Sequence, residues 1–336
     1  MEKGRGPYER GEELRKLILQ EIAKGGDDVT ARVAPKAGVQ PQAVRKHLRD
    51  LLRRGTVDSE GTTRDRTYLL VTKQWDKIYY RIHGLAEDRA WGDLEPFIGD
   101  LPKNVLSIWN TGFTEMFNNA IDHSEATEID VHAWKNAVFT EVEISDNGIG
   151  IFKKIQRALH LSDENAAIVE LAKGKFTTDS SKHSGEGIFF TSKMFDSFDI
   201  VSGHHSFLKN RGSSARPGTM VWMKLANDSV RHPQDIYNEF TDDDFKFEIT
   251  KLPVRLAQYG GQNLVSRSQA KRIMSRMEKF KSGTLDFAGV DYIGQAFADQ
   301  IFRVFRASHP DFELKYVNAE PEVAKMIRHV EGNTPA

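Results

Sequence analysis

Two neighbouring stretches of the sequence decide its fold: FTEMFNNAIDH at residues 113–123 and EVEISDNGIGI at residues 141–151. If the first stretch is helical, Glu115 and Asn119 lie one turn apart and share a face of the helix. An asparagine oxygen can bind a divalent metal that also holds phosphates, and a glutamate can take a proton from an attacking water or hydroxyl. One further turn extends this polar set, which then comprises Glu115, Asn119, Asp122 and His123. Similar pairs occur on many solvated helices, so the second stretch has to support the interpretation.

The second stretch reads as an alternating strand that ends in a glycine-containing turn. Asp146 closes the strand, where its carboxylate can accept a hydrogen bond from an amino group. Gly148 and Gly150 lack a Cβ, which lets the backbone approach a ligand closely, although an Asn-Gly pair also suits a simple turn. Together the helix and the strand end favour a nucleotide site.

A third glycine-containing element, SGEGI, precedes a predicted helix. Loop amides beside a helix N-terminus bind phosphate, which makes Gly185 and Gly187 candidate site residues. Lys182, just upstream, would either neutralise a terminal phosphate or be one more solvated loop lysine. Thr219 then leads into another strand with alternating apolar residues.

The order of these four elements resembles the GHKL nucleotide-binding fold, which type II topoisomerases, mismatch-repair ATPases, sensor histidine kinases and anti-sigma-factor kinases share. In TEMFNNAIDH, the resemblance implies that Glu115 is the base and Asn119 the magnesium ligand. In SDNGIGI, it implies that Asp146 binds the adenine amino group while Gly148 and Gly150 surround the nucleotide. The implied fold is an α/β sandwich, with helices on one face of a mixed sheet.

The remaining boxes and the cofactors follow from the same resemblance. SGEGI matches the second glycine box in a shorter form, and Thr219 stands where a threonine supports the adenine and its water. ATP and Mg²⁺ are the implied cofactors. The expected nucleotide-binding set is Asn119, Asp122, His123, Asp146, Gly148, Gly150, Lys182, Gly185, Gly187 and Thr219, with Asn119 also the metal ligand.

Glu115 bears on the branch of this family. Sensor histidine kinases usually carry an asparagine at this position and need an upstream phosphoacceptor histidine, where this chain has His47 and His83. His83 lacks the acidic neighbour of the family's acceptor motif. Glu115 fits the hydrolysing branch and the anti-sigma-factor kinases, so ATP hydrolysis, transfer to a protein hydroxyl and binding alone are three open interpretations.

Residues 1–75 carry three helical patterns and then a hairpin pattern. The third helix places apolar Val44 and Leu48 on one side and basic residues around the rest. This order resembles a winged helix-turn-helix, in which the third helix enters the DNA major groove and the hairpin touches phosphates. The implied DNA-contacting residues are Gln40, Gln42, Arg45, Lys46, Arg49, Arg64 and Arg66. The basic residues would equally suit the solvated surface of a protein-binding or dimerisation module.

The formal charge supports this division of the chain. Residues 1–73 hold 16 Lys and Arg against 11 Asp and Glu, a net of +5, which leaves −6 of the overall −1 for the remainder. A basic N-terminal segment on an otherwise acidic chain is a weak indication of nucleic-acid binding.

The other segments predict a linker and a second α/β domain. Residues 76–100 are rich in aromatic side chains and predict a connecting helix before the nucleotide-binding domain at 101–228. Residues 229–336 alternate strand and helix, with one helix predicted to end at Gly283. The stretch TLDFAGVDYIGQAFADQIFRVF resembles the STAS domain of anti-sigma-factor antagonists. Gly294 and its neighbours stand where that family has a phosphoacceptor serine, so docking or dimerisation is expected there without phosphorylation.

Length and composition exclude several other classes. At 336 residues the chain is long enough for two or three domains, and the absence of cysteine excludes disulfides and thiolate chemistry. No signal peptide and no run of eighteen apolar residues is present, so we expect a cytoplasmic protein without membrane contact. The combined interpretation is an ATP-dependent regulator with a DNA-binding winged helix and a STAS-like partner module. The alternatives are a serine/threonine protein kinase of the anti-sigma type and a non-catalytic ATP-sensing adaptor.

Overall fold

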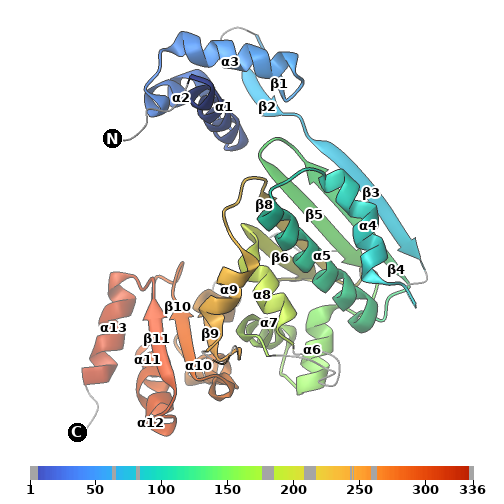
Figure 1. Cartoon of the computed structure of the whole chain (residues 1–336). Helices are drawn as coiled ribbons and strands as arrows, with labels where there is room; N and C mark the ends of the chain where they lie inside the picture. Colours follow the sequence, from blue (N-terminus) through green and yellow to red (C-terminus); the bar gives the residue numbers. More distant parts are fainter. Residues whose placement is uncertain are drawn as a thin grey trace.

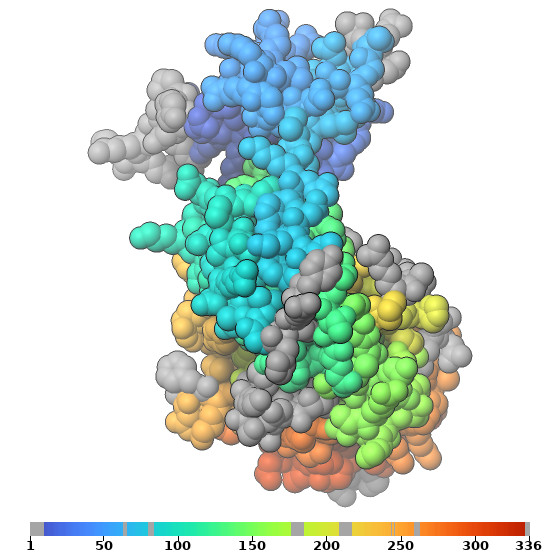
Figure 2. Space-filling model, turned by 90° about the vertical axis from the view of Figure 1, so that its right-hand side faces the viewer, coloured from blue at the N-terminus to red at the C-terminus, as the bar shows by residue number. Residues whose placement is uncertain are grey.

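Three units follow one another along the chain in this computed structural model (Figure 1). The structure describes residues 7–62, 66–80, 84–175, 185–207, 217–242, 244, 246–258 and 263–332. The N-terminal unit lies at one end of the molecule, as the space-filling view in Figure 2 shows in blue. The middle and C-terminal units share one hydrophobic core, whereas the N-terminal unit has a core of its own.

The N-terminal unit consists of α1 (Pro7–Ala23), α2 (Val29–Ala37), α3 (Pro41–Arg53) and an antiparallel hairpin of β1 (Val57–Glu60) and β2 (Thr67–Leu70). Pro41 opens α3, where its missing N–H leaves no intrahelical bond unmade. Ile18 of α1, Val33 of α2 and Leu48 of α3 meet in the core and are at most 1% exposed. The helices and hairpin expected from the sequence are therefore present.

The middle unit is built on a six-stranded sheet. Its spatial order is β3 (Lys73–Tyr80), β4 (Glu128–Lys135), β5 (Phe139–Asp146), β8 (Met220–Ala226), β6 (Ser197–Ser202) and β7 (His205–Ser206). Every neighbouring pair among these described strands is antiparallel, so the prediction of a mixed sheet is wrong for them. The short turn between β4 and β5 requires this pairing, because a parallel neighbour needs a long crossover connection.

Strand β3 corrects the prediction of a connecting helix over residues 76–100. The helix α4 occupies only Glu87–Ile98, while β3 is an edge strand that pairs with β4. Tyr79 in this strand is buried, and its ring contacts that of Phe117 with centroids 5.3 Å apart. Residues 73–80 are therefore part of the sheet, because pairing and aromatic burial outweigh local helix propensity.

Helices α4 and α5 (Lys103–His123) lie against one face of the sheet (Figure 1). Helix α5 buries Trp109, Phe113 and Phe117 completely, and the facing side chains of β4 include the fully buried Ile129 and Val131. This packing fixes α5 along its length. The unit is completed by α6 (Ile151–Leu159), α7 (Glu164–Lys173) and α8 (Gly187–Met194).

The C-terminal unit is a small parallel sheet with the strand order β11–β10–β9. Its elements are α9 (Pro233–Phe240), β9 (Ile249–Pro253), η1 (Val254–Ala257), α10 (Arg267–Met274), η2 (Met277–Lys279), β10 (Ser282–Asp286), α11 (Gln295–Asp299), the π-helical turn η3 (Gln300–Phe305), α12 (Arg306–Ser308), β11 (Glu313–Val317) and α13 (Pro321–Gly332). The predicted α/β alternation is present, but the helix expected to end at Gly283 ends at Met274. Gly283 lies inside β10, where a Cβ would come within 2.7 Å of the Phe312 ring. No helix in the described ranges is long and apolar enough to span a membrane.

Candidate functional site

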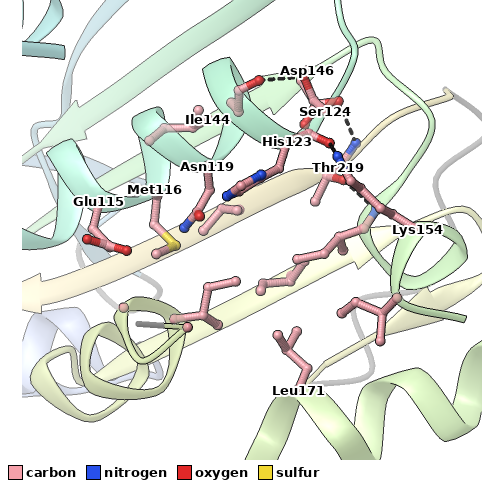
Figure 3. A pocket seen from close by; sticks show the side chains of 18 of the residues that line it. Glu115, Met116, Asn119, His123, Ser124, Ile144, Asp146, Lys154, Leu171 and Thr219 are labelled. Atoms are coloured by element: carbon pink, nitrogen blue, oxygen red, sulfur yellow. Dashed lines mark hydrogen bonds between the residues drawn. The ribbon is translucent and has the colours of Figure 1, made fainter. Parts of the chain in front are cut away.

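A pocket of about 360 Å³ opens between α5 and the end of the six-stranded sheet (Figure 3). Its walls come from α5, β5, α6, α7, α8, β6, β8 and α9. Apolar side chains, including Ile144, Ile200 and Val221, form the sheet side. Ligand pockets of this size are typically apolar with a few fixed polar groups.

Three polar side chains of α5 enter the pocket at successive turns: Glu115, Asn119 and His123. Their spacing of four residues keeps them on one stripe, and Met116 and Ala120 lie beside them in the lining. The structure therefore brings together these three predicted residues. A helical rise of about 1.5 Å per residue separates Glu115 from His123 by roughly 12 Å along the axis.

Asp122 does not join them. It is exposed and absent from the lining, contrary to the prediction that it contributes to the site. The pocket faces the side of α5 that carries Asn119 and His123, and Asp122 lies about 100° around the helix from His123. Local spacing identified the helix but not which side of it faces the pocket.

Asp146 lies at the other end of the pocket from Glu115 (Figure 3). Its Oδ1 accepts hydrogen bonds from the backbone N–H of Gly148 at 2.8 Å and of Thr219 at 3.3 Å. Burial raises the pKa of Asp146 to about 6, against the lowering effect of these two amides. One carboxylate oxygen is thus held by the protein, and no hydrogen bond to Oδ2 is recorded among the described residues.

Gly148 and Gly150 serve the fold and not the pocket surface. Neither residue lines the pocket. A Cβ on Gly148 would overlap the carbonyl oxygen of Ser124, and a Cβ on Gly150 would come 2.5 Å from the Ser202 hydroxyl. Gly150 also has a φ of +86°. The two glycines let the turn pack closely against Ser124 and Ser202, and the Gly148 N–H holds Asp146, while their contact with a ligand stays a prediction.

The remaining predicted residues fall into two groups. Gly185, Gly187 and Thr219 line the pocket, and a Cβ on Gly187 would overlap the Glu115 carboxylate. The hydroxyl of Thr219 accepts a hydrogen bond from the N–H of Ile151 at 3.0 Å, which ties the start of α6 to β8. Lys182 lies outside the described residues.

Sequence reasoning missed four polar residues of the pocket: Ser124, Lys154, Glu186 and Tyr237. Lys154 of α6 lines it, and its Nζ donates a hydrogen bond to the carbonyl oxygen of His123 at 2.6 Å. Tyr237 of α9 also lines it, although α9 follows all four predicted boxes in the sequence. Lys154 and Tyr237 belong to no motif, so only the tertiary structure reveals them. Glu186 lies within SGEGI and Ser124 directly follows TEMFNNAIDH, so the motifs located these two without marking them as site residues.

The pocket suits a metal that arrives with phosphates better than a resident ion. Among the described residues no group of three or more histidine, aspartate and glutamate side chains could hold a metal. The Asn119 carboxamide lines the pocket. Its buried NH₂ group has no hydrogen-bond partner in the described part of the chain and could donate to a phosphate, while its oxygen is the atom that could bind a metal. Because Mg²⁺ often takes one or two protein ligands and completes its shell with phosphate and water, Asn119 fits that role.

Residues 110–229 match the family model of histidine kinase-, DNA gyrase B- and HSP90-like ATPases. This part of the chain is a GHKL ATPase domain. The predicted GHKL domain is thereby confirmed, and its motif residues Glu115, Asn119 and Asp146 meet in the one pocket just described. Residues 269–324 match a STAS-like domain of unknown function, which confirms the second predicted resemblance. Neither match includes the N-terminal unit, and no curated protein shows a significant match to this chain.

Proposed function

We propose that this chain binds ATP with Mg²⁺, hydrolyses it, and uses the nucleotide state to regulate its N-terminal and C-terminal units. One observation carries the proposal: the pocket of the ATPase domain has a partly buried carboxylate, Asp146, at one end and Glu115 at the other (Figure 3). Asn119 lies on the same side of α5 as Glu115, between Glu115 and the end of the pocket that would bind adenine.

Each of these side chains has a separate task in the proposed reaction. The Asp146 carboxylate accepts a hydrogen bond from the adenine amino group. The Asn119 oxygen holds Mg²⁺, which would neutralise charge on the phosphates. Glu115 takes a proton from water while the water oxygen bonds to the terminal phosphorus and the bond from that phosphorus to ADP breaks, so that phosphate and ADP leave.

Replacing Glu115 by glutamine is expected to slow phosphate release about a hundredfold or more, because a carboxamide cannot take the proton. ATP affinity should stay within about threefold, since the two side chains have the same size. Steady-state phosphate release and equilibrium ATP binding measure the two effects, with Glu95→Gln on the exposed surface of α4 as the matched control.

Unchanged release by Glu115→Gln would contradict the assignment of the base. If the native chain binds ATP tightly without releasing phosphate, two other functions fit the same pocket. One is transfer of phosphate to a serine or threonine hydroxyl of another protein, as in the anti-sigma-factor kinases. The other is a non-catalytic adaptor that senses ATP.

Adenosine affinity is expected to weaken as the pH falls through about 6. Asp146 has a pKa raised by burial to about 6, so acid protonates it and removes the acceptor for the adenine amino group. Because this folded-state pKa is raised, the contribution of Asp146 to stability falls as pH rises from about 4 to 6. Acid therefore weakens binding without destabilising the fold through this residue. Titration with adenosine from pH 5 to 8 avoids phosphate protonation, and a flat affinity profile would contradict the role of Asp146.

We propose further that the N-terminal unit is a winged helix that binds DNA through α3. Helix α3 buries Val44, Leu48 and Leu51 and turns its basic side outward. Arg45, Lys46 and Arg49 are exposed and form no ion pair with any described residue. Gln40, Gln42 and Arg66 are exposed as well, while Arg64 lies outside the described residues.

Removing the basic side of α3 is expected to weaken binding to duplex DNA at least tenfold. Each lost phosphate contact lowers the slope of log affinity against log salt by about 0.9, so Arg45, Lys46 and Arg49 changed together to alanine should reduce it by up to about 3. Fluorescence anisotropy at several salt concentrations measures both quantities. The control removes the same charge from the C-terminal unit by changing the exposed Lys279, Lys315 and Lys325 to alanine. An equal loss in both triple variants would refute a DNA interface on α3.

The STAS-like unit is proposed to relay the nucleotide state to a protein partner or a second copy. Lys173 ends helix α7, two residues after the pocket-lining Leu171. Its buried Nζ pairs with Glu170 at 2.6 Å and donates to the carbonyl oxygen of Arg272, at the end of α10, at 3.2 Å. The Thr250 hydroxyl of β9 in turn donates to the Lys173 carbonyl oxygen at 2.7 Å. These bonds tie the two units together, since separating the units would leave the buried ammonium of Lys173 without its carbonyl partner and the Thr250 hydroxyl without its acceptor.

A further inference from the structure

One wall of the pocket comes from outside the matched ATPase domain. Tyr237 lies on α9, beyond residue 229, and it alone among the described lining residues does so. Its ring packs on Phe190 of α8 with centroids 4.5 Å apart. Phe240, one turn along α9, packs on Phe189 at 4.9 Å. Helix α9 is thus held against α8, whose first residues line the pocket beside Glu115.

The phenol lies at the Glu115 end of the pocket. Burial raises the pKa of Tyr237, and the negative charges of Glu115 and Glu186 raise it further. The phenol therefore stays protonated near neutral pH and remains a hydrogen-bond donor. Its hydroxyl makes no hydrogen bond to any residue that the structure describes, although packing on Phe190 alone would need only a phenylalanine. A ligand in the pocket could supply the hydrogen-bond acceptor that this half-buried donor lacks.

We propose that Tyr237 binds the terminal phosphate of ATP, donating a hydrogen bond from its phenol to a phosphate oxygen. The proposal rests on the proposed ATP site and extends it. Asp146 fixes the adenine end, and Glu115 lies at the opposite end of the pocket, where the terminal phosphate would be placed (Figure 3). Tyr237 lines that same end from α9, near enough to Glu115 and Glu186 to feel their charges, so ATP engages it and adenosine does not.

This contact would make the ATP site depend on the C-terminal half of the chain. After α9 the chain passes through a bridge between Thr241 and Phe247 into β9, the edge strand of the parallel sheet. Phe247 packs on Phe189 at 4.7 Å and on Phe280 at 5.3 Å. A ligand that favours one position of α9 therefore biases the packing of the STAS-like unit through the same aromatic cluster.

The test compares ATP and adenosine binding to the full chain. Tyr237→Phe keeps the ring and its packing but removes the donor, so affinity for ATP with Mg²⁺ should fall about tenfold. Affinity for adenosine, which lacks phosphates, should stay within about twofold. Tyr316→Phe is the control, because Tyr316 lies on β11 against Phe302 at 5.7 Å and outside the pocket lining.

The outcomes separate this proposal from the proposed function. Equal ATP affinity of Tyr237→Phe and the native chain, with adenosine bound normally, would overturn the phosphate contact and leave the ATP site standing. Equal losses for ATP and adenosine would also overturn it, since the phenol would then act only on the shape of the pocket. Absence of adenosine binding to the native chain would overturn the nucleotide site and this proposal with it.

Discussion

Replacing Asp146 by asparagine is expected to lower affinity for ATP about a hundredfold. The backbone nitrogens of Gly148 and Thr219 are 2.8 and 3.3 Å from Asp146 Oδ1. The side-chain oxygen of an asparagine can still accept both of these hydrogen bonds. Its NH₂ group would then face the adenine amino group, placing donor against donor in a partly buried site. A lost hydrogen bond to a charged group costs about 1.5–3 kcal/mol and an unsatisfied donor about 1–3 kcal/mol, and the lower end of their sum corresponds to a loss of affinity of about a hundredfold.

Isothermal titration of ATP with native and variant protein measures the loss. Asp122→Asn makes the same chemical change on an exposed residue outside the pocket and should leave affinity unchanged. Thermal unfolding of the free proteins checks that Asp146→Asn is folded. The variant should unfold at a temperature no lower than the native chain, because it removes a carboxylate whose ionisation is opposed by burial. Undiminished ATP affinity would show that adenine does not bind at Asp146.

Replacing Gly218 by alanine is expected to destabilise the ATPase domain severely, on the order of 4 kcal/mol or more. Gly218 has a φ of +96°, which a side chain disfavours. A Cβ there would also overlap the carbonyl oxygen of Asp146 and lie 2.7 Å from the carbonyl carbon. The Gly218 carbonyl oxygen accepts the hydroxyl of Ser202 at 2.8 Å, so the strand cannot shift without breaking that bond.

Denaturant unfolding followed by circular dichroism measures this effect. The N-terminal unit has its own core, so its transition should be retained while that of the rest moves to lower denaturant concentration. Gly203→Ala separates strain from collision, because Gly203 has a φ of +58° with no atom within 4 Å of the added Cβ. We expect a loss of about 1 kcal/mol there. Similar losses at the two glycines would show that backbone strain alone, and not the contact with Asp146, explains the effect.

The ATPase motifs were readable from the sequence because they depend on local spacing. Glu115 and Asn119 are one helical turn apart, and Asp146 ends an alternating strand. Both patterns can therefore be recognised without knowing which distant segments pack against them. The basic side of α3 is also predictable from local spacing, since Val44 and Leu48 mark the buried side of the helix. DNA binding by that surface stays a prediction.

The errors share a different cause. Residues 76–80 were assigned to a helix, but they pair with β4, which is about fifty residues away in the sequence. Asp122 lies one residue from His123 and is nevertheless exposed and outside the pocket lining. In each case the deciding partner is distant in sequence, and a local pattern carries no information about it.

The sequence by itself predicted the two domains that the family models match, a GHKL domain and a STAS-like domain. It also predicted, from helix and strand periodicity, two carboxylates and a carboxamide that the pocket brings together. Only the tertiary structure decided which further residues shape the pocket. The turn glycines press against the Ser124 and Ser202 regions, and Tyr237 enters the pocket from a helix beyond the ATPase domain. These features depend on close packing between segments far apart in the chain, which spacing along the sequence does not encode.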